Sequence, residues 1–206
     1  MATFRIIPTK EKILNIAVAL FGKYGYNGTS LQQIADIAEI KKSSIYNYYE
    51  SKDHILRQIY TAFTDEMMAQ IPSKEDIKTE IEKSDSVEEF WKSHIRKQYE
   101  DSITSYSGRL WKVISQEQYK DERAGKLILK ETERQIEFLT MIFKLMLKRN
   151  LIKKADPLQL ATSFHYANQA IHLEFLILHT FDMDTTDCLK KAMTHADYFI
   201  GKIKKG

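Results

Sequence analysis

Residues 29–49, with the sequence TSLQQIADIAEIKKSSIYNYY, predict two short helices joined by a tight turn. Thr29 or Ser30 supplies the hydroxyl that accepts a hydrogen bond from an unpaired backbone N–H at the start of the first helix. Its apolar face consists of residues at helical spacing, namely Leu31, Ile34, Ala35 and Ala38. The second helix is expected over about residues 41–49, so the segment predicts a helix-turn-helix.

The second helix of this pair has an outer surface whose chemistry suits nucleic acid. Only Ile45 and one edge of the tyrosine cluster are expected to be buried. Ammonium groups neutralise phosphates, hydroxyls hydrogen-bond phosphate oxygens, and lysine or serine reaches base edges in the major groove. The residues expected on this surface are Lys41, Lys42, Ser43, Ser44, Tyr46, Asn47, Tyr48 and Lys52. Spacing and composition alone also allow an ordinary solvated helix with tyrosines packed on the core.

A longer stretch, FGKYGYNGTSLQQIADIAEIKKSSIYNYYESKDHIL, closely resembles the DNA-binding segment of the tetracycline-repressor (TetR) family of bacterial transcription regulators. The resemblance covers about residues 9–60. The matching positions are Phe21–Gly25, Thr29, Ser30, Ile34, Ala35, Ala38, Lys42, Ser44, Ile45, Tyr46, Tyr49, Ser51, Lys52 and Asp53. It implies that Lys42 and Ser43 approach base edges. It also implies that Tyr46, Asn47, Tyr48 and Lys52 hold the phosphate backbone, with help from Ser30 and Gln32.

Three residues depart from the family pattern. Glu39 stands where glycine is usual in the turn, so we expect a backbone strain of about 1 kcal/mol there. Lys41 replaces a small capping hydroxyl, which weakens the helix start but adds a positive charge. Ser43 replaces a glycine and adds a side chain beside the bases. These departures affect the base preference and not the expectation of DNA binding.

The whole chain is expected to be all-α, because it has only three prolines and seven glycines in 206 residues and long stretches of 3.6-residue periodicity. Further helices are predicted at about 9–24, 52–71, 87–106, 108–119, 121–149, 157–179 and 185–204. Residues 73–86 form either a short exposed helix or a mobile link. We expect a three-helix DNA-binding domain at 1–54 and a helical ligand-binding and dimerisation domain at 55–206.

Composition and charge agree with this reading. The formal charge of +3 implies that any nucleic-acid footprint is a local patch. A lone Cys188 excludes an intramolecular disulfide and fits a reducing cytosol. The first residues, MATFRIIP, lack the apolar run of a signal peptide, and no run of about 18 uncharged apolar residues occurs. We therefore expect a cytoplasmic protein without a membrane partner.

Enzyme motifs are absent from the sequence. No histidine follows a glutamate at the spacing of di-metal helical bundles, and one cysteine cannot build a zinc site of the usual spacing. Glycine-rich phosphate loops and a nucleophile elbow are also missing. We expect neither an enzyme nor a cofactor.

One polar stripe interrupts the otherwise apolar helix predicted at 157–179. Its members share one helical face and are His165, Asn168, Gln169 and His172. The two histidines lie about 10 Å apart along the axis, so they cannot readily chelate one metal ion. The stripe is either a polar seam at a homodimer interface or in the core, or one wall of a ligand pocket. In the second reading it faces the aromatic residues Trp91, Trp111 and Phe138.

The family resemblance also implies a quaternary structure and a ligand. It implies a homodimer formed through about 157–179 and 185–204, and a small-molecule cavity in the second domain. The expected function is a repressor that binds a near-palindromic operator and is released by an unidentified small molecule. A transcriptional activator of the same fold and a non-regulatory helical ligand-binding protein remain the alternatives.

Overall fold

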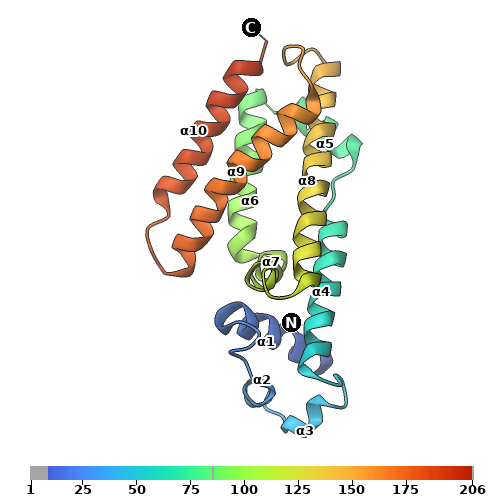
Figure 1. Cartoon of the computed structure of the whole chain (residues 1–206). Helices are drawn as coiled ribbons and strands as arrows, with labels where there is room; N and C mark the ends of the chain where they lie inside the picture. The colour runs from blue at the N-terminus through green and yellow to red at the C-terminus, as the bar shows by residue number, and fades with distance from the viewer. Residues whose placement is uncertain (1–8, 85, 206) are drawn as a thin grey trace, which may run out of the picture. The chain divides into compact units, whose positions relative to one another are not determined.

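The computed structural model describes residues 9–84 and 86–205, which form ten α-helices (Figure 1). In chain order they are α1 (Thr9–Tyr24), α2 (Leu31–Ala38), α3 (Lys42–Ile45), α4 (Lys52–Ala69), α5 (Lys74–Lys83), α6 (Val87–Thr104), α7 (Tyr106–Glu117), α8 (Glu122–Lys148), α9 (Pro157–Thr180) and α10 (Thr186–Ile203). These residues contain no strand, and their only β-type pairing is an isolated bridge between Ile152 and Lys204. The predicted all-α class is confirmed.

Contacts divide the chain into two compact units. The first unit holds the residues up to Gln70 together with Ser102–Leu129, and the second holds Ile71–Asp101 and the residues from Lys130 onwards. The boundary expected between the two functional domains, at residues 54 and 55, differs from the boundary between these two compact units. The reason is that α4 buries its apolar face in the same core as α1 and α7.

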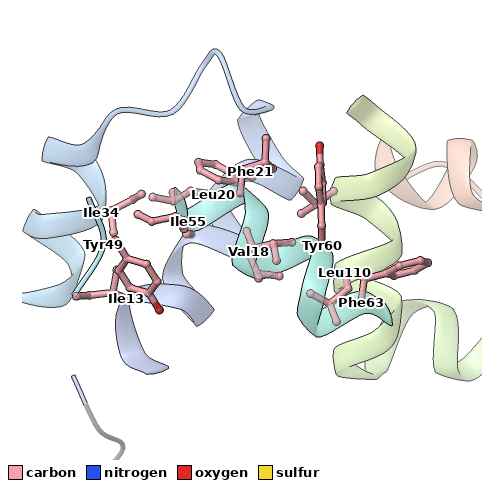
Figure 2. Packing of buried hydrophobic residues seen from close by; sticks show 14 of the residues in the cluster. Ile13, Val18, Leu20, Phe21, Ile34, Tyr49, Ile55, Tyr60, Phe63 and Leu110 are labelled. Carbon is pink, nitrogen blue, oxygen red and sulfur yellow. The ribbon is translucent and has the colours of Figure 1, made fainter. Parts of the chain in front are cut away.

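The core of the first unit gathers apolar side chains chiefly from α1, α2, α4 and α7 (Figure 2). Ile13, Val18, Leu20 and Phe21 come from α1, and Ile34 comes from α2. On α4 the buried residues are Ile55, Leu56, Ile59, Tyr60, Phe63 and Met67. On α7 the buried apolar residues are Leu110, Val113 and Ile114. This core holds the two helices of the predicted helix-turn-helix in place.

The core of the second unit is built around Trp91 of α6. Its ring stacks on Phe143 of α8 at 5.1 Å between centroids and contacts Phe164 of α9 at 4.7 Å. Helices α9 and α10 lie side by side (Figure 1), with Ala192 and Ala196 of α10 buried between them and their neighbours. Small side chains at such positions let two helices approach closely.

One predicted helix is shorter in the structure than expected, and the structure decides between the two alternatives for residues 73–86. The helix expected over 41–49 is α-helical only over Lys42–Ile45, because the next residues form i→i+3 turns such as Tyr48 N–H to Ile45 O at 2.9 Å. The segment at 73–86 contains a helix, α5. Ile77 and Ile81 of α5 are buried in the core of the second unit, so this segment is structural.

Candidate nucleic-acid interface

Helix α2 is fixed at its start by two neighbouring hydroxyl residues. Ser30 is the N-cap: its hydroxyl accepts a bond from the Gln33 N–H at 3.2 Å, and the Gln33 amide oxygen accepts the Ser30 N–H at 2.7 Å. This reciprocal pair is a capping box and satisfies two unpaired donors. Thr29 is buried instead, and its hydroxyl donates to the carbonyl oxygens of Leu20 and Gly25. The cap therefore falls on Ser30, the second of the two expected candidates.

The turn after α2 adopts the left-handed conformation expected from the family pattern. Glu39 has φ 59° and ψ 42°, and the N–H of Ile40 bonds back to Ala35 O at 3.0 Å. A side chain in this region costs about 1 kcal/mol relative to glycine. Lys12 of α1 lies 3.7 Å from the exposed Glu39 carboxylate, so α1 partly neutralises the charge that the turn brings.

Helix α3 presents most of the predicted DNA-contacting side chains to solvent. Lys41 is its N-cap and makes no side-chain capping bond, in agreement with the sequence. The exposed residues are Lys41, Lys42, Ser43, Tyr46, Asn47 and Tyr48, while Ser44 is half-buried. They form one polar, positively charged and aromatic surface that leads from the turn to the start of α4.

This exposed surface is anchored from below by Ile45 and Tyr49. Ile45 is fully buried in the first core, and Tyr49 is buried with its hydroxyl donating to the Lys10 carbonyl at 2.9 Å. Burial raises the pKa of Tyr49 to about 12, so its hydroxyl stays a donor at neutral pH. The Lys10 ammonium lies 5.8 Å from the centre of the Tyr49 ring. Sequence reasoning left Lys10 and Lys12 out of the interface, because they stand some 30 residues before it.

Lys52 of α4 is engaged within the protein. Its ammonium donates to the carbonyl oxygens of Tyr26 at 2.9 Å and Thr29 at 2.8 Å, and it lies 4.2 Å from the centre of the Tyr26 ring. An ammonium has three donors, so one N–H remains for a phosphate. Gln32 is exposed and donates to Asp36 at 2.7 Å. Lys52 thus ties the loop before α2 to the start of α4.

The predicted ligand residues are only partly brought together. Trp111 packs on Phe63 in the first core, with ring centroids 5.2 Å apart, whereas Trp91 and Phe138 belong to the second. On α9 the polar stripe splits. His165, Asn168 and His172 are buried, but Gln169 is exposed, since it lies at the edge of the buried face. The sequence could not distinguish these positions, because all four lie on one side of the helix at i, i+3, i+4 and i+7.

Several polar atoms in the second core lack a hydrogen-bond partner among the described residues. They are Trp91 Nε1, Asn168 Oδ1, His172 Nε2 and His195 Nε2. The amide nitrogen of Asn168 donates to Gln98 of α6 at 2.9 Å. A buried polar atom without a partner costs free energy, and a hydrogen bond to a bound molecule would remove that cost. These atoms are therefore candidates for contact with a small molecule.

Burial in this core also affects the histidines. It lowers the pKa of His165 and His195, and lowers that of His172 to about 4. These side chains are accordingly neutral at physiological pH, and they offer hydrogen bonds without charge.

We expect stability to fall as the pH drops from about 6.5 to 4, because the unfolded chain takes up a proton at His172 before the folded chain does. The contribution of His172 to the free energy of unfolding is fully present above about pH 6.5. Below about pH 4 this residue alone lowers the free energy of unfolding by about 3 kcal/mol. Urea unfolding across this range, compared between the wild type and His172→Gln, measures the effect. An equally steep decline in His172→Gln would contradict the assignment.

The described residues contain neither a metal-binding group of side chains nor a membrane-spanning helix. Within residues 9–84 and 86–205, no three His, Cys, Asp or Glu side chains are grouped to hold a metal ion. None of the helices described is both long and apolar enough to cross a membrane.

The part of the chain that contains the candidate interface is similar in sequence to known proteins. Residues 13–59 match the family model described as bacterial regulatory proteins, tetR family. Over 49 residues the chain is 43% identical to the IcaR protein of Staphylococcus epidermidis, described as a negative transcriptional regulator of the biofilm operon icaADBC. This match covers 24% of the present chain and 26% of IcaR, so about a quarter of that relative is matched.

Solved structures match nearly the whole chain in fold. A protein from Mesorhizobium loti described as a TetR-family transcriptional regulator superposes with a TM-score of 0.69 at 17% identity, covering 96% of this chain and 97% of that one. A transcriptional regulator from Saccharomonospora viridis in complex with choline superposes with a TM-score of 0.65 at 18% identity, covering 96% and 98%. The fold is therefore shared across both compact units, while the sequence match is limited to the N-terminal helices.

Proposed function

The chain belongs to the tetR family of bacterial regulatory proteins, and from this premise we propose that it is a DNA-binding repressor of transcription in the cytoplasm. It binds a near-palindromic operator as a homodimer and is released by a small molecule. The observation that carries the proposal is the exposed surface of α3, held by Ile45 and Tyr49 on the first core. The description of IcaR as a negative regulator supports repression over activation.

In the proposed complex, α3 enters the major groove. Lys42 and Ser43 approach base edges, while Tyr46, Asn47 and Tyr48 hold phosphates together with the remaining N–H of Lys52. Lys41 and Ser44 flank the base contacts, and Ser30 and Gln32 support them from α2. Residues 1–54 are the reading domain in this proposal, and residues 55–206 carry regulation and dimerisation.

The proposed dimer forms through α9 and α10. Tyr166, Leu173 and Ile177 of α9 are exposed and recur at helical spacing on a different face from the buried histidines. Tyr198 is exposed on α10. Large apolar side chains gathered on the face of a helix are typical of a protein interface, and a second copy of the same chain supplies a matching face.

The proposed effector site lies in the second unit, beside α6, α9 and α10. Its support is the group of buried, unpartnered polar atoms on Trp91, Asn168, His172 and His195. The S. viridis structure shows choline bound in a protein of the same fold. The effector favours a conformation in which α4 has swung and the two reading helices no longer match the half-site spacing.

Selection of genomic fragments by the purified protein at about 0.15 M salt tests the proposal. The best fragment is then titrated against a scrambled sequence. We expect a shared inverted repeat that binds at least about 1,000-fold more tightly than the control. Binding without sequence selectivity, at every protein concentration tested, would contradict operator recognition.

Replacing Lys42 by alanine should weaken operator binding by about 1–3 kcal/mol and change the preferred base at the contacted position. The reason is that its ammonium is exposed and free to reach a base edge, so its loss removes both affinity and discrimination. Fluorescence anisotropy with single-base operator variants measures both. Lys126→Ala on α8 is the matched control, since it removes one exposed lysine away from the motif.

A further inference from the structure

The start of α4 is bonded to a segment that lies about 70 residues later in the chain. We name residues 116–123, which include the end of α7 and the start of α8, the α7–α8 corner. Arg123 Nη2 donates to Asp53 Oδ1 of α4 at 2.8 Å and to Asp121 Oδ2 at 2.7 Å, while its Nε donates to Asp121 Oδ1 at 3.0 Å. One guanidinium therefore bridges α4 and the corner, with a bidentate grip on Asp121.

Tyr60, two turns further along α4, contacts both Asp121 and Arg123 of this cluster. Its hydroxyl donates to Asp121 Oδ2 at 3.0 Å, and its ring lies 5.5 Å from the guanidinium carbon of Arg123. Arg57 pairs with Asp53 as well, so two carboxylates face two guanidinium groups. Hydrogen bonds from Arg123 lower the pKa of both Asp53 and Asp121, and the cluster stays charged at neutral pH.

The α7–α8 corner also forms hydrogen bonds with the end of α1 and with the loop that precedes α2. Gln116 donates to the Gly22 carbonyl at the end of α1, at 2.8 Å. The buried Glu117 carboxylate accepts the Tyr26 N–H at 3.2 Å. Tyr26 is the residue whose carbonyl oxygen binds Lys52 at the start of α4. The corner therefore contacts the segments on both sides of α2 and α3, and Lys52 joins those two segments to each other.

We propose that the α7–α8 corner is a clamp that sets the orientation of the α2–α3 reading head, and that Arg123 is its positioning residue. The inference rests on the proposed function, because it assigns to the cluster a role in matching operator half-sites. Helix α8 begins at Glu122, so Arg123 lies in its first turn and ties the start of α4 to the start of α8 within the first unit. Arg123 touches no base or phosphate in this scheme.

The expected consequence concerns half-site spacing. Inserting one base pair between half-sites moves them apart by about 3.4 Å and rotates them by about 35°, which a firmly held pair of heads rejects. Arg123→Ala leaves Asp53 and Asp121 without their shared cation and loosens the head. The preference for the natural spacing over a spacing changed by one base pair should then fall about 2- to 30-fold. The number of phosphate contacts, and hence the salt dependence, should stay unchanged.

The experiment compares the wild type, Arg123→Ala, Arg123→Lys and Lys126→Ala on the selected operator and on versions with one base pair inserted or deleted. Lys keeps the charge but lacks the planar fork, so an intermediate spacing preference is expected. Lys126 pairs with Glu122 on the exposed side of α8 and should behave as wild type. A merely structural role would lower the melting temperature and the active fraction but would leave the spacing preference intact, and that result overturns the proposal.

A second readout needs no DNA. Hydrogen exchange at the start of α4, over residues 52–57, should become faster in Arg123→Ala than in Lys126→Ala. Unchanged exchange there overturns the clamp. If the wild type selects no operator while exchange responds as expected, the proposed function fails and the clamp on α4 stands as a structural device. The two failures are thus distinguishable.

Discussion

Replacing Ile34 by alanine is expected to lower the free energy of unfolding by about 2–5 kcal/mol and to abolish operator binding at ordinary temperatures. Ile34 is 0% exposed and lies in the core with Leu20 of α1 and Ile55 of α4 (Figure 2), so truncation leaves a cavity in the small core that supports α3. A loss of this size is a large part of the stability of an average domain. Chemical denaturation monitored by circular dichroism measures it.

The control for this prediction lies on the same helix. Ile37 is 54% exposed, and Ile37→Ala should change the stability by no more than about 0.5 kcal/mol. The two substitutions remove the same atoms, so their difference isolates burial from helix propensity. Equal destabilisation by both would mean that α2 does not pack as described.

Replacing Leu173 and Ile177 together by glutamate is expected to convert the protein to a monomer at micromolar concentration. These residues are 56% and 50% exposed on α9 in the single chain, so the substitutions leave the fold of each protomer intact. In the proposed dimer they bury four carboxylates against an apolar face, which costs several kcal/mol for each charge. The dimer dissociation constant should rise at least about 1,000-fold, as sedimentation equilibrium can measure.

Leu129→Glu provides the matched control for the dimer prediction. Leu129 is 66% exposed on α8 and lies outside α9 and α10. This variant carries the same chemical change and should remain dimeric. A dimeric Leu173→Glu/Ile177→Glu protein would exclude the α9 face from the interface.

Local pattern predicted much of the fold and of the reading head. The helix start at Ser30 follows from a short-range rule, because capping acts within one turn, whereas the left-handed turn at Glu39 was expected from the family resemblance. The ends of α7 and α8 were predicted within two residues for the same reason. These features need no knowledge of distant parts of the chain.

Features that depend on distant residues escaped prediction. The early end of α3 is linked to Tyr49, which reaches the Lys10 carbonyl 39 positions away. The grip of Glu117 and Arg123 on the reading head joins residues 70 or more positions apart. Trp111 was grouped with the ligand residues because aromatic side chains at helical spacing look alike, and only packing assigns it to the other core.

Helix α9 presents two faces with different chemistry, polar atoms buried on one side and exposed apolar side chains on the other. In the proposed repressor, effector and partner subunit contact different faces of one helix, so we expect a shift of α9 on effector binding to change the affinity between the subunits. Through that coupling, the dose of effector needed to switch a promoter depends on how many copies of the regulator a cell contains.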